Sequence, residues 1–213
     1  FPLEILKEKS IDFDINPLNK KFTEDQLAEC IHNYDAIIAG TEKITDFVLS
    51  KAKKLKIISR VGIGLDSVDL ISARDRGIIV SYTPDAPAPA VAELTLGLMI
   101  TLLRSVHLSN LELHKGTWKR YFGKRLSEVT IGIIGVGRIG YRVLRRTKSF
   151  GTPKILVNDI NPNHVLDREM KVEWTTKETI IKQSDIISLH LPLTSRTRNL
   201  ITKKELLSMK KDA

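Results

Sequence analysis

Short apolar runs alternate along the chain with longer segments in which apolar residues recur at helical spacing. Helix-like segments separate the runs, and this alternation predicts an α/β fold. The run from Ile131 to Ile134 is β-branched and has no polar position, as is typical of a strand buried on both faces of a parallel sheet. The strands that we expect are 34–40, 56–59, 78–80, 131–134, 155–157 and 185–190, with a weak one at 171–174 and an alternating one at 11–15.

Three prolines interrupt the pattern at Pro84, Pro87 and Pro89 and predict a domain boundary. We therefore expect one domain over residues 1–88 and a second over residues 89–213. The second begins with a long helix, from Ala90 to about His114, with Gly116 beyond it as a C-terminal signal. Apolar residues surround this helix on most sides, so we expect it to be buried between domains or at a subunit interface.

Composition places the chain among globular proteins. With 213 residues and 42% apolar content it can bury a substantial core. A single cysteine, Cys30, excludes an intramolecular disulfide framework and favours a reducing compartment. The longest apolar stretch, Val91 to Leu103, contains Glu93 and is too short to cross a bilayer. We expect a cytoplasmic protein that binds no membrane.

The formal net charge of +9 suggests anionic ligands. The basic residues are spread along the chain rather than gathered in one motif, which argues against nucleic acid. The stretch from Trp118 to Arg125 is basic with interleaved aromatic residues, and a solvated connector with aromatics packed inward is the favoured interpretation. We expect a small anionic ligand and no nucleic acid.

A glycine pattern follows the apolar run at 131–134. Gly135, Gly137 and Gly140 give G-x-G-x-x-G where a strand must turn into a helix. In this pattern the first glycine permits a tight turn, the second lets the backbone approach a pyrophosphate, and the third lets the helix pack closely on the strand. The positive end of the helix would then face the diphosphate.

Asp159 supports a dinucleotide site at this turn. It stands 19 residues after Gly140, at the end of the second apolar run. A carboxylate at the tip of the second strand can accept both hydroxyls of an adenosine ribose, and it would repel a 2′-phosphate, so it predicts NAD rather than NADP. The alternative is an ordinary βαβ unit with a solvated aspartate.

Five motifs in one order carry a family resemblance. They are Arg60-Val-Gly-Ile-Gly-Leu-Asp-Ser-Val-Asp69, Tyr-Thr-Pro-Asp-Ala-Pro at 82–87, Val-Ala-Glu-Leu-Thr at 91–95, Gly-Val-Gly-Arg-Ile-Gly at 135–140 and His-Leu-Pro-Leu-Thr at 190–194. The chain resembles the D-isomer-specific 2-hydroxyacid dehydrogenases, and among them most the D-3-phosphoglycerate dehydrogenase branch.

The resemblance implies two doubly wound parallel-sheet domains with the active site in the cleft between them: a flavodoxin-like substrate domain and a Rossmann NAD-binding domain, the latter incomplete here. It implies hydride exchange between NAD and a D-2-hydroxy or 2-keto acid, such as phosphoglycerate, glyoxylate or hydroxypyruvate. It also implies a homodimer or higher homo-oligomer. Two other functions stay open: an NAD-responsive corepressor on the same fold, and a catalytically inactive truncated relative.

By this resemblance, the substrate carboxylate would bind the loop of Arg60, Val61, Gly62 and Gly64, whose glycines suit an anion-binding backbone. A tight turn with a surface arginine is the alternative. The cofactor residues implied, besides the three glycines and Asp159, are Thr83 on the nicotinamide side, Arg138 and Ile139 at the pyrophosphate, and Leu191, Pro192 and Thr197 beside the adenosine. For Leu191 and Pro192 a structural role at a strand end is an equal alternative.

No residue here matches the catalytic Arg, Glu and His of that family, which we expect downstream of Ala213 in a protein truncated at both ends. His190 is at a strand end near the expected cofactor site, but no carboxylate motif accompanies it, so we interpret it as structural. His32, His107, His114 and His164 lack a supporting constellation. No His, Cys or carboxylate spacing predicts a metal site.

Overall fold

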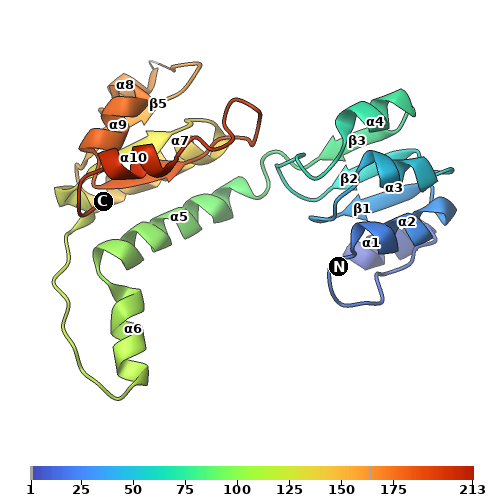
Figure 1. Ribbon diagram of the computed structural model, residues 1–213, viewed down its shortest axis with the longest axis horizontal. Coiled ribbons are helices and arrows are strands. Elements are labelled where there is room, and N and C mark those ends of the chain that lie inside the picture. Colours follow the sequence, from blue (N-terminus) through green and yellow to red (C-terminus); the bar gives the residue numbers. More distant parts are fainter. Residues whose placement is uncertain (1, 164) are drawn as a thin grey trace. The chain divides into compact units, whose positions relative to one another are not determined.

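The computed structural model describes residues 2–163 and 165–213, so Phe1 and His164 lie outside the described residues. The chain divides into two compact units, residues 1–82 and 83–213, and each is described by itself (Figure 1). Both contain a parallel sheet with helices packed on it, which confirms the predicted α/β class. Pro84, Pro87 and Pro89 lie just inside the second unit.

The first unit contains a three-stranded parallel sheet in chain order, β1-β2-β3. Its strands end in register, because Ala39 pairs with Arg60 and Arg60 with Tyr82, so the loops that follow them leave from one edge of the sheet. The elements are α1 (Pro2–Glu8), α2 (Glu24–Cys30), η1 (Ile31–Asn33), β1 (Ala36–Ala39), α3 (Asp46–Lys51), β2 (Ile57–Arg60), α4 (Leu70–Asp75) and β3 (Ile79–Tyr82).

Apolar side chains of α2, α3 and α4 pack on one face of this sheet. Leu27, Val48 and Ala73 join Ala39 and Ile58 in one buried cluster. The helices begin where the sequence predicts: Thr23 and Gln26 form a reciprocal capping box at α2, and Asp69 caps α4 by accepting the N–H of Ser72 at 2.9 Å.

The strand expected at 11–15 is wrong. No strand is assigned there, and Ile11 and Ile15 are exposed. Alternation alone specifies a strand only when one face has a core to pack against. Here Asp14 instead accepts a hydrogen bond from the Tyr34 hydroxyl at 2.8 Å, as part of an irregular segment.

The second unit contains a four-stranded parallel sheet in the order β6-β5-β4-β7. Chain order reverses at β4, which has β5 on one side and β7 on the other, so the sheet has the topology of a Rossmann fold, as predicted. The elements are α5 (Ala88–Leu103), α6 (Val106–His114), η2 (Leu126–Glu128), β4 (Thr130–Ile134), α7 (Arg138–Thr147), η3 (Lys148–Phe150), β5 (Lys154–Asn158), α8 (Val165–Met170), β6 (Glu173–Trp174), α9 (Lys177–Gln183), β7 (Ile186–Leu189) and α10 (Lys203–Ser208).

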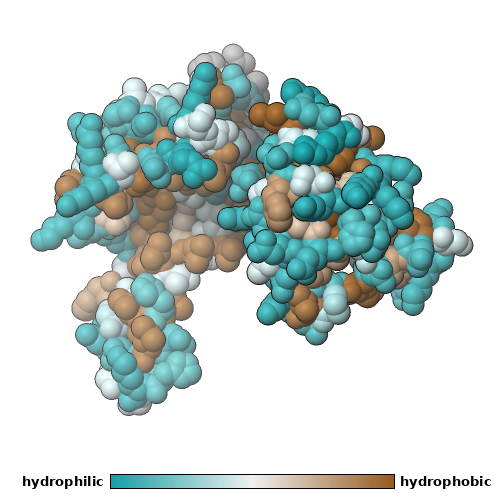
Figure 2. Space-filling view, turned by 45° about the vertical axis from the view of Figure 1, so that its right-hand side comes forward, coloured by the Kyte–Doolittle hydropathy of each residue, from teal (hydrophilic) through white to brown (hydrophobic). Residues whose placement is uncertain are grey.

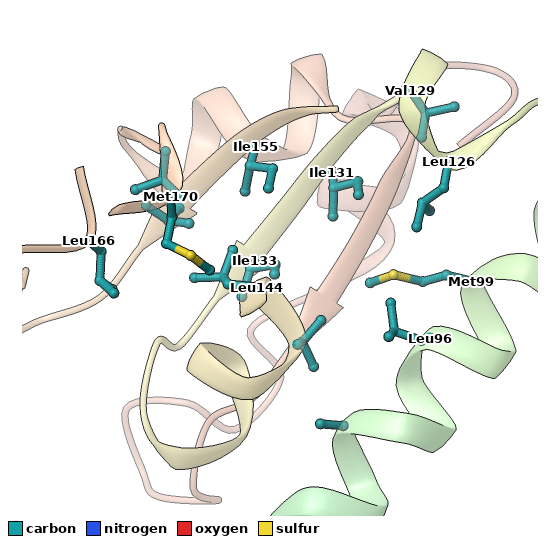
Figure 3. Close-up of a cluster of buried hydrophobic side chains, with 14 residues drawn as sticks. Leu96, Met99, Leu126, Val129, Ile131, Ile133, Leu144, Ile155, Leu166 and Met170 are labelled. Carbon is teal, nitrogen blue, oxygen red and sulfur yellow. The ribbon is translucent and has the colours of Figure 1, made fainter. Parts of the chain in front are cut away.

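Helices cover both faces of this sheet. On one face, Ile131, Ile133 and Ile155 pack against side chains of α5, α7 and α8, as Figure 3 shows for Leu96, Met99, Leu144 and Met170. On the other face, Ile134 and Leu156 pack against Ile180 of α9. Strands buried on both faces explain the unbroken apolar runs in the sequence.

Asp185 contacts both the start of β4 and the segment after α10. Its Oδ2 accepts the N–H of Thr130 at 2.7 Å, and its Oδ1 lies 3.0 Å from Lys210 Nζ. Burial raises the pKa of this carboxyl, but the Thr130 N–H and the Lys210 ammonium together lower it by more than burial raises it. The pKa is therefore below its ordinary value. The folded protein therefore favours the charged form.

We expect Asp185→Asn to destabilise the second unit by about 1–2 kcal/mol at neutral pH, because it removes a charge-assisted contact. The pKa of Asp185 is lower in the folded protein than in the unfolded chain, where it is about 3.9. This stabilisation is therefore present at pH values above the unfolded pKa and is lost as the pH falls through the folded pKa. Urea unfolding between pH 3 and 7 measures it. Glu173→Gln, which breaks the exposed pair with Lys154, is the control and should cost less. Equal effects of the two variants would contradict the expectation.

The long helix expected from Ala90 to His114 is two helices, α5 and α6, bent by 67°. Ser105, at the break, has φ 52° in the left-handed region. One side of α5 is buried, whereas α6 has no buried residue, and apolar side chains are visible along both (Figure 2). Among the described residues no single helix is long and apolar enough to cross a membrane, and only this bent pair meets the length and composition test together.

Candidate functional site: the glycine turn

The glycine pattern forms the connection between β4 and α7. Gly135 follows β4 and has φ +95°, a conformation that favours glycine. A Cβ there would lie 2.4 Å from the carbonyl oxygen of His190, so the loop after β7 closes against the turn. The Gly135 N–H donates to the carbonyl of Asn158 at 2.8 Å. The turn is thus held from both neighbouring strands.

Gly137 and Gly140 differ in their surroundings. A Cβ on Gly140 would lie 2.1 Å from the carbonyl oxygen of Gly135, so only glycine lets α7 pack this closely on the turn. A Cβ on Gly137 would meet nothing within 4 Å. Because Gly137 immediately precedes α7, the open space lies at the helix end whose first N–H groups have no partner within the helix. This end suits an anion.

Asp159 lies against the same turn. Its Oδ2 accepts the N–H of Val136, between the first two glycines, at 2.7 Å, and its Oδ1 accepts the N–H of Asn161 at 2.9 Å. The backbone therefore fixes the carboxylate at the carboxyl end of β5. A carboxylate accepts about four hydrogen bonds, so this one keeps capacity for the two hydroxyls of a ribose.

Arginines follow the turn along α7. Arg138 is its first residue, and Arg142, one turn later, donates to the carbonyl of Arg138 at 2.9 Å. An open surface hollow of about 360 Å³ lies beside them. It is lined by Val136, Gly137, Arg138, Tyr141, Arg142, Asn163, Leu166 and Glu169. Ile139 is half-buried, and its side chain packs against the core, so only its backbone faces the turn.

The loop after β7 holds the remaining residues expected beside the adenosine. Leu191 packs on the cluster of Ile134 and Leu156. The hydroxyl of Thr197 donates to the carbonyl of Pro192 at 2.5 Å and accepts the N–H of Thr194 at 2.8 Å, so it closes this loop on itself. For Leu191 and Thr197 these contacts support a structural role, while Pro192 is exposed.

His190 lies between this loop and the turn. Its Nε2 is 3.0 Å from the Ser188 hydroxyl, and burial lowers the pKa of its imidazole, so the ring is neutral near pH 7. Its carbonyl lies against Gly135, which gives its backbone a structural function. Among the described residues, no three His, Cys, Asp or Glu side chains gather as metal ligands.

The loop expected to bind a substrate carboxylate lies in the first unit, after β2. Gly62 has φ +143°, which favours glycine, and the guanidinium of Arg60 folds over it and donates to the carbonyl of Val61. The Val61 N–H donates to the carbonyl of Ala39 at 2.9 Å, so it contributes to the sheet edge. A Cβ on Gly64 would lie 2.7 Å from Asp66 Oδ1, so an acidic side chain also faces this loop.

The structure thus brings the glycines, Arg138 and Asp159 together at one turn, and places Thr83 directly after β3, in the second unit. Two groups that make contacts at this turn were not predicted from the sequence. The Val136 N–H has no sequence signal because it is a backbone group. Asp85 pairs with Arg142 at 3.1 Å across 57 residues, a separation that no local pattern reveals.

Comparison with known proteins bears on this site. The model of the D-isomer specific 2-hydroxyacid dehydrogenase NAD-binding domain matches residues 96–213, which include the turn and Asp159. The D-3-phosphoglycerate dehydrogenase of Methanocaldococcus jannaschii is 40% identical over 90% of this chain and 37% of its own length. The hydroxypyruvate reductase of Thermotoga maritima is 36% identical over 92% of this chain and 64% of its own.

A solved structure agrees with these relatives. The D-lactate dehydrogenase from Aquifex aeolicus, complexed with NAD and lactic acid, superposes with a TM-score of 0.82 and 29% identity, over 98% of this chain and 62% of that chain. The chain therefore spans between 37% and 64% of the length of these proteins. As the sequence motifs predicted, the chain belongs to the D-isomer-specific 2-hydroxyacid dehydrogenase family and contains its NAD-binding domain.

Proposed function

We propose that the complete protein exchanges a hydride between NAD and a D-2-hydroxy or 2-keto acid. One observation carries this proposal. The glycine turn leaves open space beside Gly137, and its Val136 N–H donates to the carboxylate of Asp159, so an anion site and a ribose acceptor lie at the same turn. When bound, NAD would accept the hydride from a 2-hydroxy acid, and NADH would donate it to a 2-keto acid. In this proposal the chain's own residues bind the diphosphate at the start of α7 and the adenosine ribose at Asp159. No residue of this chain is assigned the proton transfer.

For the substrate we propose a short anionic acid bound at the Arg60 loop of the first unit. Arg60 Nε is buried without a hydrogen-bond partner among the described residues, and Nη1 donates to the carbonyl of Val61. In this proposal the guanidinium turns out of that position to donate to the anion. A second negative group, such as a phosphate, would suit this arginine, which favours a phosphoglycerate-like substrate. Glyoxylate and hydroxypyruvate are the competing substrates, and relatives named for them match this chain as well.

A panel of 2-keto acids with NADH tests this proposal in the complete protein. We expect oxidation of NADH with at least one short acid, and a higher kcat/KM for a phosphorylated acid than for glyoxylate. Arg60→Gln should raise KM for the phosphorylated acid about ten-fold or more, with little change in affinity for NADH. Binding of NADH without turnover of any acid would instead support a regulatory, non-enzymatic function.

We also propose that the complete protein is a homodimer through the exposed face of α5 and α6. Ala92, Leu96 and Met99 of α5 are buried in the second unit. The opposite side of α5 and most of α6 expose the apolar residues Leu94, Leu98, Leu102, Val106, Leu111 and Leu113. Trp118 and Phe122, in the connector that follows, are 85% and 93% exposed, so the expectation that the aromatic residues of the connector pack inward is wrong for these two. An exposed apolar surface of this kind is typical of a protein interface.

Light scattering of the complete protein at micromolar concentration tests the dimer. We expect twice the mass of one chain, and a shift to the monomer in a Leu98→Asp, Leu102→Asp double variant, because two desolvated carboxylates would oppose association. A monomer in the unchanged protein would contradict the proposal.

A further inference from the structure

Asp85 brings a negative charge to the side of the glycine turn. It lies in the segment between β3 and α5, and its two carboxylate oxygens face two arginines of α7. Oδ2 accepts from Nη2 of Arg142 at 3.1 Å, and Oδ1 lies 3.8 Å from Nε of Arg138. The carbonyl of Asp85 also accepts the N–H of Ala88 at the start of α5, which fixes its backbone.

The two arginines hold this carboxylate unequally. The Arg142 side chain is 27% exposed and also binds the carbonyl of Arg138, so it is fixed on the first turn of α7. The Arg138 side chain is 60% exposed, and its contact with Asp85 is longer. Arg138 is therefore free to turn toward a phosphate, while Arg142 keeps Asp85 in place.

A fixed negative charge at this position discriminates among ligands that share an adenosine diphosphate. Each phosphate of a dinucleotide is a diester with one negative charge. A terminal phosphate loses a second proton at about pH 6, so ADP carries more charge than the diphosphate of NAD, and ATP carries more still. Asp159 would contact the ribose that all these ligands have in common, so it does not separate them.

We propose that Asp85 selects the diphosphate of a dinucleotide against the more highly charged phosphates of ADP and ATP. The carboxylate offsets part of the charge of Arg138 and Arg142, so that the turn matches a diester and repels additional charge. This inference rests on the proposed function, because it requires a diphosphate to bind at the glycine turn.

Glu93 provides a matched control on the same pair of helices. It pairs with Arg146 at 3.2 Å, and its side chain is 68% exposed, close to the 60% of Asp85. Arg146 lies eight residues after Arg138 on α7, two turns from the glycine turn. Glu93→Gln and Asp85→Asn change the net charge equally. The first weakens one ion pair between the α5 region and α7, and the second weakens two. Only Asp85→Asn changes the charge beside the diphosphate.

Calorimetric titration of the complete protein with NADH, ADP-ribose, ADP and ATP tests the proposal, at about pH 8 and low salt, with a chelator to remove divalent cations. We expect Asp85→Asn to improve ATP binding by about three- to ten-fold, ADP binding less, and ADP-ribose binding by about two-fold or less. Asp85→Glu, which keeps the charge, and Glu93→Gln should both retain the original ratio of ADP-ribose to ATP affinity. Thermal melts identify any variant that fails to fold.

The proposed selection by Asp85 would be overturned if Asp85→Asn changed the affinities for all four ligands by the same factor. It would also be overturned if Glu93→Gln changed the ratio of ADP-ribose to ATP affinity as much as Asp85→Asn does. Weaker ATP binding by a folded Asp85→Asn protein would overturn it as well. If the unchanged protein binds neither NADH nor ADP-ribose, the proposed function fails, and the selection fails with it. If the unchanged protein binds NADH and ADP-ribose, but Asp85→Asn leaves the ratio of ADP-ribose to ATP affinity unaltered, the proposed role of Asp85 fails and the proposed function stands.

Discussion

Asp159→Arg is expected to reverse the cofactor preference of the complete protein from NADH to NADPH. The carboxylate that would accept two ribose hydroxyls is lost, and charge-assisted hydrogen bonds contribute about 1.5–3 kcal/mol. The guanidinium would instead attract a 2′-phosphate, which Asp159 repels. We expect the ratio of the Kd values for the two cofactors to change by about a hundred-fold or more. Fluorescence titration with NADH and with NADPH measures that ratio.

Asp159→Asn separates the charge from the hydrogen bond with Val136. Asparagine keeps one oxygen that can accept the Val136 N–H, so the glycine turn should keep its geometry, whereas the oxygen that accepts the Asn161 N–H is replaced by an amide NH2. We expect NADH to bind more weakly than in the unchanged protein, but NADPH to gain less than with arginine. If both variants keep the original preference, Asp159 does not contact the ribose.

Gly140→Ala is expected to destabilise the second unit by about 3 kcal/mol or more, because overpacking against fixed backbone forces the chain to move. The added Cβ would lie 2.1 Å from the carbonyl oxygen of Gly135, and no side-chain rotation relieves that contact. The carbonyl belongs to the turn that Asn158 and His190 hold in place, so the strain spreads to β5 and to the loop after β7. Denaturant unfolding of the complete protein measures the loss.

Gly137→Ala is the matched control for that variant. Gly137 has φ −74°, which alanine adopts without strain, and its Cβ would meet nothing within 4 Å. We expect the free energy of unfolding to change by less than about 1 kcal/mol, while the affinity for NADH falls about ten-fold or more, since the methyl group enters the space proposed for the diphosphate. If Gly140→Ala were as stable as the unchanged protein, the close packing would be wrong. If Gly137→Ala bound NADH normally, the position of the diphosphate would be wrong.

Local rules were sufficient to predict the inner strands and the glycine turn of the second unit. β-Branched runs without polar positions predicted β4 and β5, because strands buried on both faces need no alternation. The glycine spacing predicted the turn, since the φ of Gly135 and the close approach at Gly140 are both requirements of the backbone. Asp159 was predicted from its distance along the chain, and the structure adds its contact with Val136.

Local rules failed where a distant contact or a single backbone angle decides the structure. The segment from Ala90 to His114 has continuous helical character, but Ser105 adopts a left-handed conformation that ends α5. Ile11 and Ile15 alternate like a strand without a partner strand to pair with. The ion pair of Asp85 with Arg142 joins an exposed carboxylate to a half-buried guanidinium. Such a pair leaves no periodic pattern in a sequence.

Calorimetric titration of the complete protein with NADH tests the central claim most directly, namely that the turn between β4 and α7 binds a dinucleotide diphosphate while Asp159 holds the adjoining ribose. We predict saturable binding at one site per chain, with a Kd on the order of micromolar, and weaker binding of NADPH. Absence of measurable binding of NADH by folded, complete protein would contradict the claim.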